Sequence, residues 1–194
     1  MLILASASPR RKELLTQAGY TFEVRPAHIA EEPRAGEDAI AYVVRLAREK
    51  AQAVFDELGD AEAVVLGADT TVEVDGQILG KPEDAADAAR MLRLLSGRTH
   101  RVMTGVAVIT ARGAEVAAEV TGVRFLTLSD DEIAAYVASG EPMDKAGAYG
   151  IQGRAAKWIP RIEGDYFNVV GLPLALVSTM LEAAACGGAN SAAR

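Results

Sequence analysis

A cluster of basic residues lies where the sequence predicts the start of a helix. Ser8, followed by proline, is typical of a helix N-cap, and Arg10, Arg11 and Lys12 come in the first helical turn. Cations are unfavourable there, because unpaired N–H groups and the helix dipole already make this end positive. A bound anion reverses that effect, and Ser6 and Ser8 add hydroxyl donors beside it. The pattern therefore indicates a phosphate-type anion site, with side chains that splay into water as the alternative.

A carboxylate, Asp69, directly follows the apolar run 63–68, which has the length of a strand buried on both faces. Ligands of open α/β sheets lie beyond the carboxyl ends of strands, so this position suits a metal-binding or proton-accepting carboxylate. Asp69 is equally compatible with the first residue of a turn. Glu31 and Glu32, in a polar loop, are candidates for further carboxylates or form a solvated pair.

Two glycine-containing segments complete the candidate site. Gly80-Lys81-Pro82 does not form a P-loop, because its glycine spacing is one residue short and proline replaces the required Ser or Thr, but Lys81 can still reach a phosphate. The segment 144–153 contains three glycines that permit close backbone approach, and the Gln152 amide can pair with the amide edge of a base. A surface lysine and an ordinary flexible loop are the alternatives. The only two histidines lack a zinc-binding pattern.

Helical and strand patterns alternate along the chain and would position these residues. Strands are expected at 2–5, 22–25, 63–68, 71–74, 77–79, 101–110, 115–128 and 156–163, and helices at 8–19, 37–58, 84–95, 129–139 and 173–185. The fifth strand follows the fourth through an Asp75-Gly76 hairpin. This order predicts an α/β fold with a mixed twisted sheet flanked by helices, in two lobes around a cleft. We expect a single domain over 1–186 and a flexible tail over 187–194.

The charge, the length of the apolar runs and the cysteine content argue against several classes of partner. The net charge of −7 and the isoelectric point of about 4.9 argue against a nucleic acid polymer, which requires a broad basic face. No apolar run approaches the ~18 residues of a membrane span, and the first residues do not resemble a secretion signal. The single cysteine, Cys186, fits a reducing compartment, so a cytoplasmic protein without a membrane partner is expected.

Together these segments closely resemble the Maf family of nucleotide pyrophosphatases, from Leu2 to about Leu181. The segments that carry the resemblance are Ser6-Ala7-Ser8-Pro9-Arg10-Arg11, Arg48-Glu49-Lys50-Ala51, Gly67-Ala68-Asp69-Thr70, Gly80-Lys81-Pro82, Ser96-Gly97, Thr104-Gly105, the loop 144–153 and Val169-Val170-Gly171-Leu172-Pro173-Leu174. The loop that ends in Gln152 resembles the branch that acts on dTTP and UTP. Another branch, which acts on 7-methyl-GTP, has Glu at this position.

The resemblance implies a nucleoside triphosphate substrate, cleaved to the monophosphate and pyrophosphate by water attack on the α-phosphate. It also implies Mg or Mn as the divalent metal cation and a homodimer as the assembly. The implied roles are Asp69 as proton acceptor, Asp69 and Glu31 as metal ligands, Arg10, Thr70 and Gln152 for base preference, and Ser6, Arg11, Lys50 and Lys81 for the phosphates. The alternatives are a nucleotide-binding regulator of septum formation and a pyrophosphatase for 7-methyl-GTP or deaminated purine triphosphates.

Overall fold

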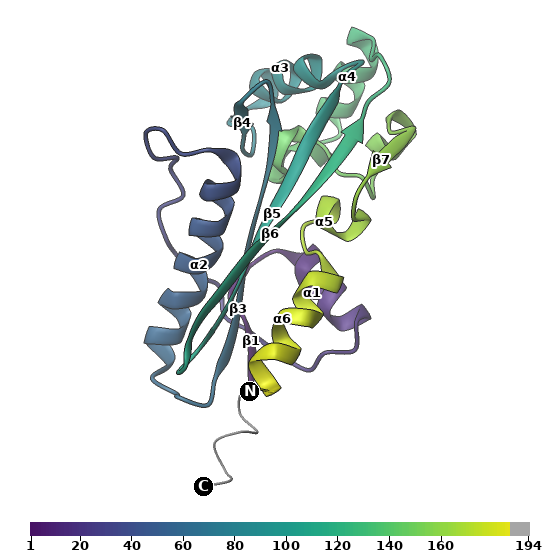
Figure 1. Cartoon of the computed structure of the whole chain (residues 1–194). Coiled ribbons are helices and arrows are strands. Elements are labelled where there is room, and N and C mark those ends of the chain that lie inside the picture. The colour runs from purple at the N-terminus through teal and green to yellow at the C-terminus, as the bar shows by residue number, and fades with distance from the viewer. Residues whose placement is uncertain (187–194) are drawn as a thin grey trace, which may run out of the picture.

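The computed structural model describes residues 1–186, so the predicted tail at 187–194 lies outside the described residues. The strands are β1 (Leu2–Leu4), β2 (Glu23–Val24), β3 (Val64–Val74), β4 (Gln77–Leu79), β5 (Thr99–Thr110), β6 (Gly113–Arg124) and β7 (Arg161–Glu163). They form one seven-stranded sheet in the order β2-β1-β3-β5-β6-β7, with β4 paired to β3 (Figure 1). β1 runs parallel to β2 and β3, and the other pairs are antiparallel, which confirms the predicted mixed sheet.

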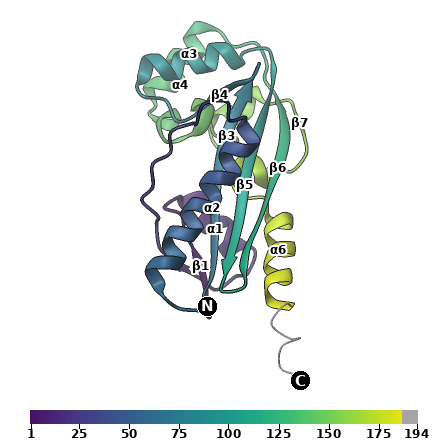
Figure 2. The same ribbon diagram turned by 60° about the vertical axis from the view of Figure 1, so that its left-hand side comes forward.

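Helices cover both faces of this sheet. They are α1 (Pro9–Gln17), α2 (Ala39–Leu58), α3 (Ala85–Leu95), α4 (Asp130–Ala138), α5 (Tyr166–Val170) and α6 (Leu174–Cys186). α2 lies along one face, and α1, α5 and α6 lie against the other (Figures 1 and 2). No helix within residues 1–186 is long and apolar enough to cross a membrane.

α2 packs unusually close to the strands. The Asp38 side chain caps its start by accepting a 2.8 Å hydrogen bond from the Ala41 N–H. A Cβ at Gly67 in β3 or at Gly105 in β5 would collide with a backbone carbonyl of α2. Glycine at both positions therefore lets the helix backbone rest on the sheet, which brings side chains of α2 within reach of β3.

The long strands β3, β5 and β6 connect two lobes. In the lobe near the N-terminus, the sheet packs against α1, α2 and α6. At the other end, α3, α4 and three 3-10 helices enclose a second core, which contains Phe125, Tyr136, Tyr149 and Trp158. The 3-10 helices are η1 (Glu141–Asp144), η2 (Ala146–Ala148) and η3 (Arg154–Trp158). The predicted two-lobed α/β architecture is confirmed.

The predicted end of a strand at residue 68 is wrong. β3 continues to Val74, because β5 pairs with it antiparallel from Val65 to Glu73. On the other edge of β3, the pairing with β1 stops at Leu66 and the pairing with β4 covers only Val72 to Val74, so the stretch between Leu66 and Val72 has no strand neighbour on that side. Asp69 thus lies in the middle of its own strand, but just beyond the carboxyl end of the parallel strand β1.

Two further strand predictions need correction, and one helix was not predicted. The predicted strand 156–163 is a strand only in β7, because η3 places Ala155 and Trp158, three residues apart, in the second core. The predicted strand 115–128 ends at Arg124, where its pairing with both β5 and β7 ends. The short helix α5 was not predicted, and the Asp165 side chain caps it.

Candidate functional site

A cleft of about 500 Å³ opens at the gap beside β3, a volume typical of small-molecule sites. Its walls come from the loop after β1, the segment between β2 and α2, the turn after β4, the 3-10 region and the α5–α6 turn. It brings together the nine residues to which the family resemblance assigns a role: Ser6, Arg10, Arg11, Glu31, Lys50, Asp69, Thr70, Lys81 and Gln152. Lys12 and Glu32, which the sequence also offered as candidates, do not line it. Both lobes contribute to it.

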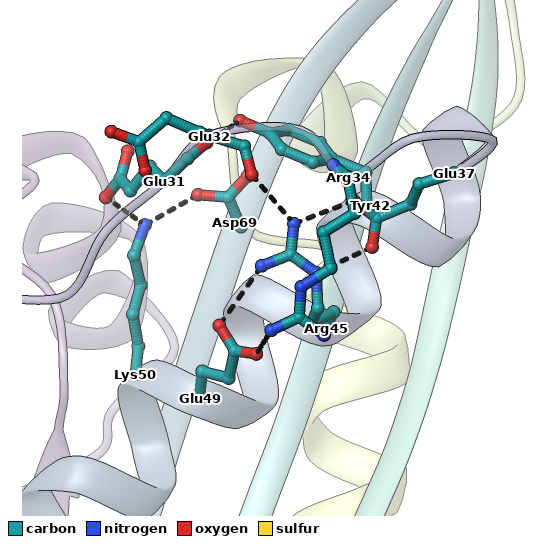
Figure 3. Close-up of polar contacts among 9 residues, drawn as sticks. All are labelled: Glu31, Glu32, Arg34, Glu37, Tyr42, Arg45, Glu49, Lys50 and Asp69. Atoms are coloured by element: carbon teal, nitrogen blue, oxygen red, sulfur yellow. Dashed lines mark hydrogen bonds and ion pairs between the residues drawn. The ribbon is translucent and has the colours of Figure 1, made fainter.

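Lys50 links two carboxylates at the floor of the cleft (Figure 3). Its Nζ lies 2.6 Å from Asp69 Oδ1 and 2.7 Å from Glu31 Oε1. The Lys50 and Asp69 side chains are 10% and 11% exposed, whereas Glu31 is 50% exposed. With one cation between two anions, this group carries a net negative charge. It can accept a proton or bind a further cation.

The two carboxylates differ in their electrostatics. Burial raises the pKa of Asp69 above its ordinary value, against the opposing charges of Lys50 and Arg11. Partial burial also acts to raise the pKa of Glu31, but the hydrogen bond and charge of Lys50, with the charges of Lys81 and Arg11, outweigh it and lower the pKa. Asp69 is therefore the more basic of the pair, which suits a proton acceptor.

Arg11 is buried and connects α1 to the sheet. Its Nε donates to the Gly171 carbonyl at 2.8 Å, Nη1 to Ser6 Oγ at 3.1 Å and Nη2 to Thr70 Oγ1 at 2.9 Å. Burial lowers its pKa, and the charge of Asp69 opposes that change. Because adjacent strand residues point to opposite faces, Asp69 points towards α2 while Thr70 points towards Arg11. Three of the five guanidinium N–H donors are thus used within the protein.

Arg10, the neighbour of Arg11, has a more open environment. Its Nη1 lies 2.9 Å from Asp144 Oδ2, in a pair whose side chains are 28% and 61% exposed. Lys145 Nζ contacts the other Asp144 oxygen at 2.6 Å. This ion pair joins α1 in one lobe to η1 in the other. Lys81 and Gln152 line the same cleft and are exposed.

Sequence reasoning missed a buried polar network behind Thr70. Thr70 Oγ1 and Thr104 Oγ1 are 2.9 Å apart, and the Thr104 hydroxyl donates to the Asn168 carbonyl at 3.1 Å. Asn168 Nδ2 donates to the Val102 carbonyl at 3.0 Å and to Thr121 Oγ1 at 2.9 Å. Asn168 belongs to α5, and no pattern in the sequence predicted that helix.

Tyr42 and Arg45, on α2, were also missed. The Tyr42 hydroxyl donates to the Glu31 carbonyl at 2.8 Å, and Arg45 contacts the neighbouring segment through several hydrogen bonds. Here a signal existed, because positions 42, 45 and 49 share one face of the predicted helix 37–58, close to Lys50.

The sequence is similar over most of its length to a known protein family and to several named proteins. The family described as "Maf-like protein" matches residues 1–184. A protein named dTTP/UTP pyrophosphatase from Koribacter versatilis is 55% identical over 183 residues, which is 94% of each chain. Proteins of that name from Salmonella typhimurium (58% over 173 residues, 89% of this chain and 87% of that one) and Moorella thermoacetica (57% over 182 residues, 93% of each) are similar as well.

Proposed function

Because this chain belongs to the Maf family, we propose that it is a nucleoside triphosphate pyrophosphatase that hydrolyses dTTP and UTP to the monophosphate and pyrophosphate. The structural observation that carries the proposal is the buried carboxylate Asp69 on the floor of a cleft lined by five basic side chains. The identity of 55–58% to relatives named dTTP/UTP pyrophosphatase supports the choice of substrate.

The charges of the cleft match a triphosphate. A nucleoside triphosphate carries about four negative charges that repel an attacking hydroxide, so a catalyst must neutralise them. Arg10, Arg11, Lys50 and Lys81 line the cleft of a protein whose net charge is −7. Such a local concentration of cations suits a small anion and not an extended polyanion. Ser6 adds a hydroxyl beside Arg11.

Asp69 and Glu31 fit a divalent cation, Mg or Mn. Hard cations of this kind are usually bound by one or two carboxylates together with substrate phosphates, and no larger group of acidic, His or Cys ligands occurs within residues 1–186. The pair already accommodates a cation, since the Lys50 ammonium lies within 2.7 Å of both side chains. When bound, the metal would supply positive charge to the phosphates.

Asp69 performs the proton transfer in this proposal. It takes a proton from a water molecule that attacks the α-phosphorus, and its pKa, raised by burial, makes it a stronger base than an exposed aspartate. Arg10, Arg11 and Lys81 hold the phosphates, and pyrophosphate leaves with the electrons of the broken P–O bond. Neither this step nor the site requires a covalent enzyme intermediate.

Gln152 recognises the base. Uracil and thymine present an O2, N3–H and O4 edge, and a side-chain amide offers both the donor and the acceptor that complement it. Arg10 and Thr70 also influence base preference. The Thr70 side chain points away from Asp69 and accepts a hydrogen bond from Arg11. It therefore influences base preference through Arg11.

Oxygen-18 labelling tests the proposal directly. The protein is incubated with dTTP, UTP, 7-methyl-GTP or dITP and Mg²⁺ in H₂¹⁸O, and the products are identified by mass spectrometry. We expect pyrophosphate from dTTP and UTP, with the label in the monophosphate, because water attacks the α-phosphorus. Tight nucleotide binding without turnover would support a sensor, and faster turnover of dITP or 7-methyl-GTP would support the other enzyme classes.

We also propose that the protein is cytoplasmic and that it forms a homodimer. Sedimentation velocity over a range of protein concentrations tests the homodimer, which predicts a species of twice the 20.4 kDa chain mass. Cell fractionation tests the location.

A further inference from the structure

The segment 25–38, which we call the arm, carries Glu31 to the cleft without any helix or strand of its own. It links β2 to α2. Glu31 reaches Lys50 from the arm, but this side chain is half exposed. An ion pair with a half-exposed partner adds little net stability, which is too little to order a fourteen-residue loop. Other contacts must therefore hold the arm in place.

Arg45 of α2 makes three hydrogen bonds to the arm (Figure 3). Its guanidinium binds Glu37 through two hydrogen bonds, Nε to Oε1 at 2.6 Å and Nη2 to Oε2 at 2.7 Å. Nη2 also donates to the Glu32 carbonyl at 3.1 Å, and Nη1 to Glu49 Oε2 at 3.1 Å. The Arg45 and Glu37 side chains are only 13% and 9% exposed, so water screens this pair far less than a surface pair.

Tyr42 adds a second attachment next to the first. Its hydroxyl donates to the Glu31 carbonyl at 2.8 Å, and the Arg45 guanidinium lies 5.6 Å from the centre of its ring. Burial raises the pKa of Tyr42 to about 12, so the hydroxyl stays a donor at neutral pH. The carbonyls of two consecutive residues, Glu31 and Glu32, are thus bound to one face of α2. By contrast, Arg34 binds Glu49 from an exposed position.

We propose that Arg45 is a positioning residue, which fixes the backbone of the arm so that the Glu31 carboxylate stays beside the Asp69 carboxylate. The inference rests on the proposed function, because it assigns Arg45 a part in cation binding by that carboxylate pair. Arg45 acts through Glu31 and does not touch the reacting atoms. Its planar fork bonds Glu37 and the Glu32 carbonyl at once, whereas a lysine has one nitrogen for both.

The first test removes the Arg45 guanidinium and uses Arg34, an exposed arginine of the arm that also bonds to α2, as the control. In Arg45→Met, we expect faster hydrogen–deuterium exchange of amides in the arm. We also expect the metal concentration for half-maximal rate to rise about tenfold, because loss of a group that orients a metal ligand typically lowers metal affinity by such a factor. The KM for nucleotide at saturating metal should change less than twofold, since the phosphate cations remain. The control, Arg34→Met, should resemble the wild type in all three measurements. Unchanged exchange, or an equal rise of the metal requirement and the nucleotide KM, overturns the inference.

The second test asks whether the effect passes through Glu31. In a Glu31→Gln background, Arg45→Met should raise the metal requirement less than twofold further, because the carboxylate that it positions is gone. A full tenfold rise in that background overturns the inference. Should Arg45→Met fail to fold, Glu37→Gln weakens the same contact with little change of shape and serves in both tests.

Failure of the inference can be separated from failure of the proposed function. If the wild type binds dTTP without hydrolysing it, the proposed function fails. Mn²⁺ binding to the protein, followed by electron paramagnetic resonance, then still decides the inference, with weaker binding expected for Arg45→Met than for Arg34→Met. Equal Mn²⁺ binding by the two variants overturns it.

Discussion

The neighbouring residues Arg10 and Arg11 lie in two regions of the cleft that are built differently. Arg11 is buried and is bonded to Ser6, Thr70 and the Gly171 carbonyl, so α1, β3 and the α5–α6 turn fix it before any ligand arrives. Arg10 contacts the other lobe through a partly exposed pair with Asp144. One region is a rigid framework, and the other is held by a contact that a ligand can replace.

The difference corresponds to two tasks. Transition-state stabilisation benefits from groups that are oriented in advance and protected from water, which describes Asp69, Lys50 and Arg11. Recognition of a base tolerates side chains that adjust, which describes Arg10 and the exposed Gln152. The comparison therefore predicts that changes in the framework affect rate and stability, and that changes in the open region affect binding and preference.

The largest effect is expected at Asp69, the framework carboxylate. Asp69→Asn keeps the shape of the side chain but removes its charge and basicity, so kcat for dTTP should fall by about 10²–10⁴. Steady-state kinetics at saturating nucleotide and metal measure this loss, with circular dichroism as the control for folding. More than about a tenth of the wild-type rate would refute the assigned role.

Replacement of the two arginines by glutamine tests the comparison itself. Arg11→Gln leaves buried acceptors without their donor, so the free energy of unfolding should fall by about 2–3 kcal/mol. Arg10→Gln removes a partly exposed ion pair and should cost less than about 1 kcal/mol, while the KM for dTTP rises. Urea denaturation without nucleotide measures both. Similar losses of stability for the two variants would show that the regions do not differ as described.

Gln152→Glu should change preference in the open region without affecting the framework. An ionised glutamate cannot donate to uracil or thymine, but it can accept from the N1–H and N2 amine of a guanine. One unpaired polar group costs about 1–3 kcal/mol, so kcat/KM for dTTP should fall at least about fivefold relative to 7-methyl-GTP. A competitive assay with both nucleotides measures the ratio. Equal losses on all substrates would assign Gln152 to the structure of its loop.

The smallest effect concerns acid stability of the arm. The hydrogen bond from Arg45 is the main reason why the pKa of Glu37 is lowered to about 2. A lowered pKa in the folded state stabilises the protein above the ordinary pKa of glutamate, and this contribution is lost as the pH falls towards 2. Between pH 5 and 3 the thermal midpoint should therefore fall more in the wild type than in Glu37→Gln. Glu163→Gln, in the exposed pair with Arg161, is the control and should follow the wild type.

Much of the site was predictable because local patterns place its residues. The helix start after Ser8 locates Arg10 and Arg11, the apolar run 63–68 locates Asp69, and the hairpin at Asp75-Gly76 is present, with φ values of 53° and 77°. The capping box at Ser129 is also formed, with both of its reciprocal hydrogen bonds. Each of these features depends on contacts within a few residues, so the sequence alone specifies it.

The structure alone decided what depends on contacts between distant residues. The pairing of β5 extends β3 through Asp69, and the early end of β1 opens the cleft beside it. Trp158 enters the second core in a 3-10 helix although its segment has a strand pattern. Thr70 and Asn168 become parts of one network, through Thr104, only after the sheet and α5 have assembled. Local sequence determined which side chains were available, and tertiary packing determined their partners, because burial and long-range pairing favour one arrangement among many with similar local propensity.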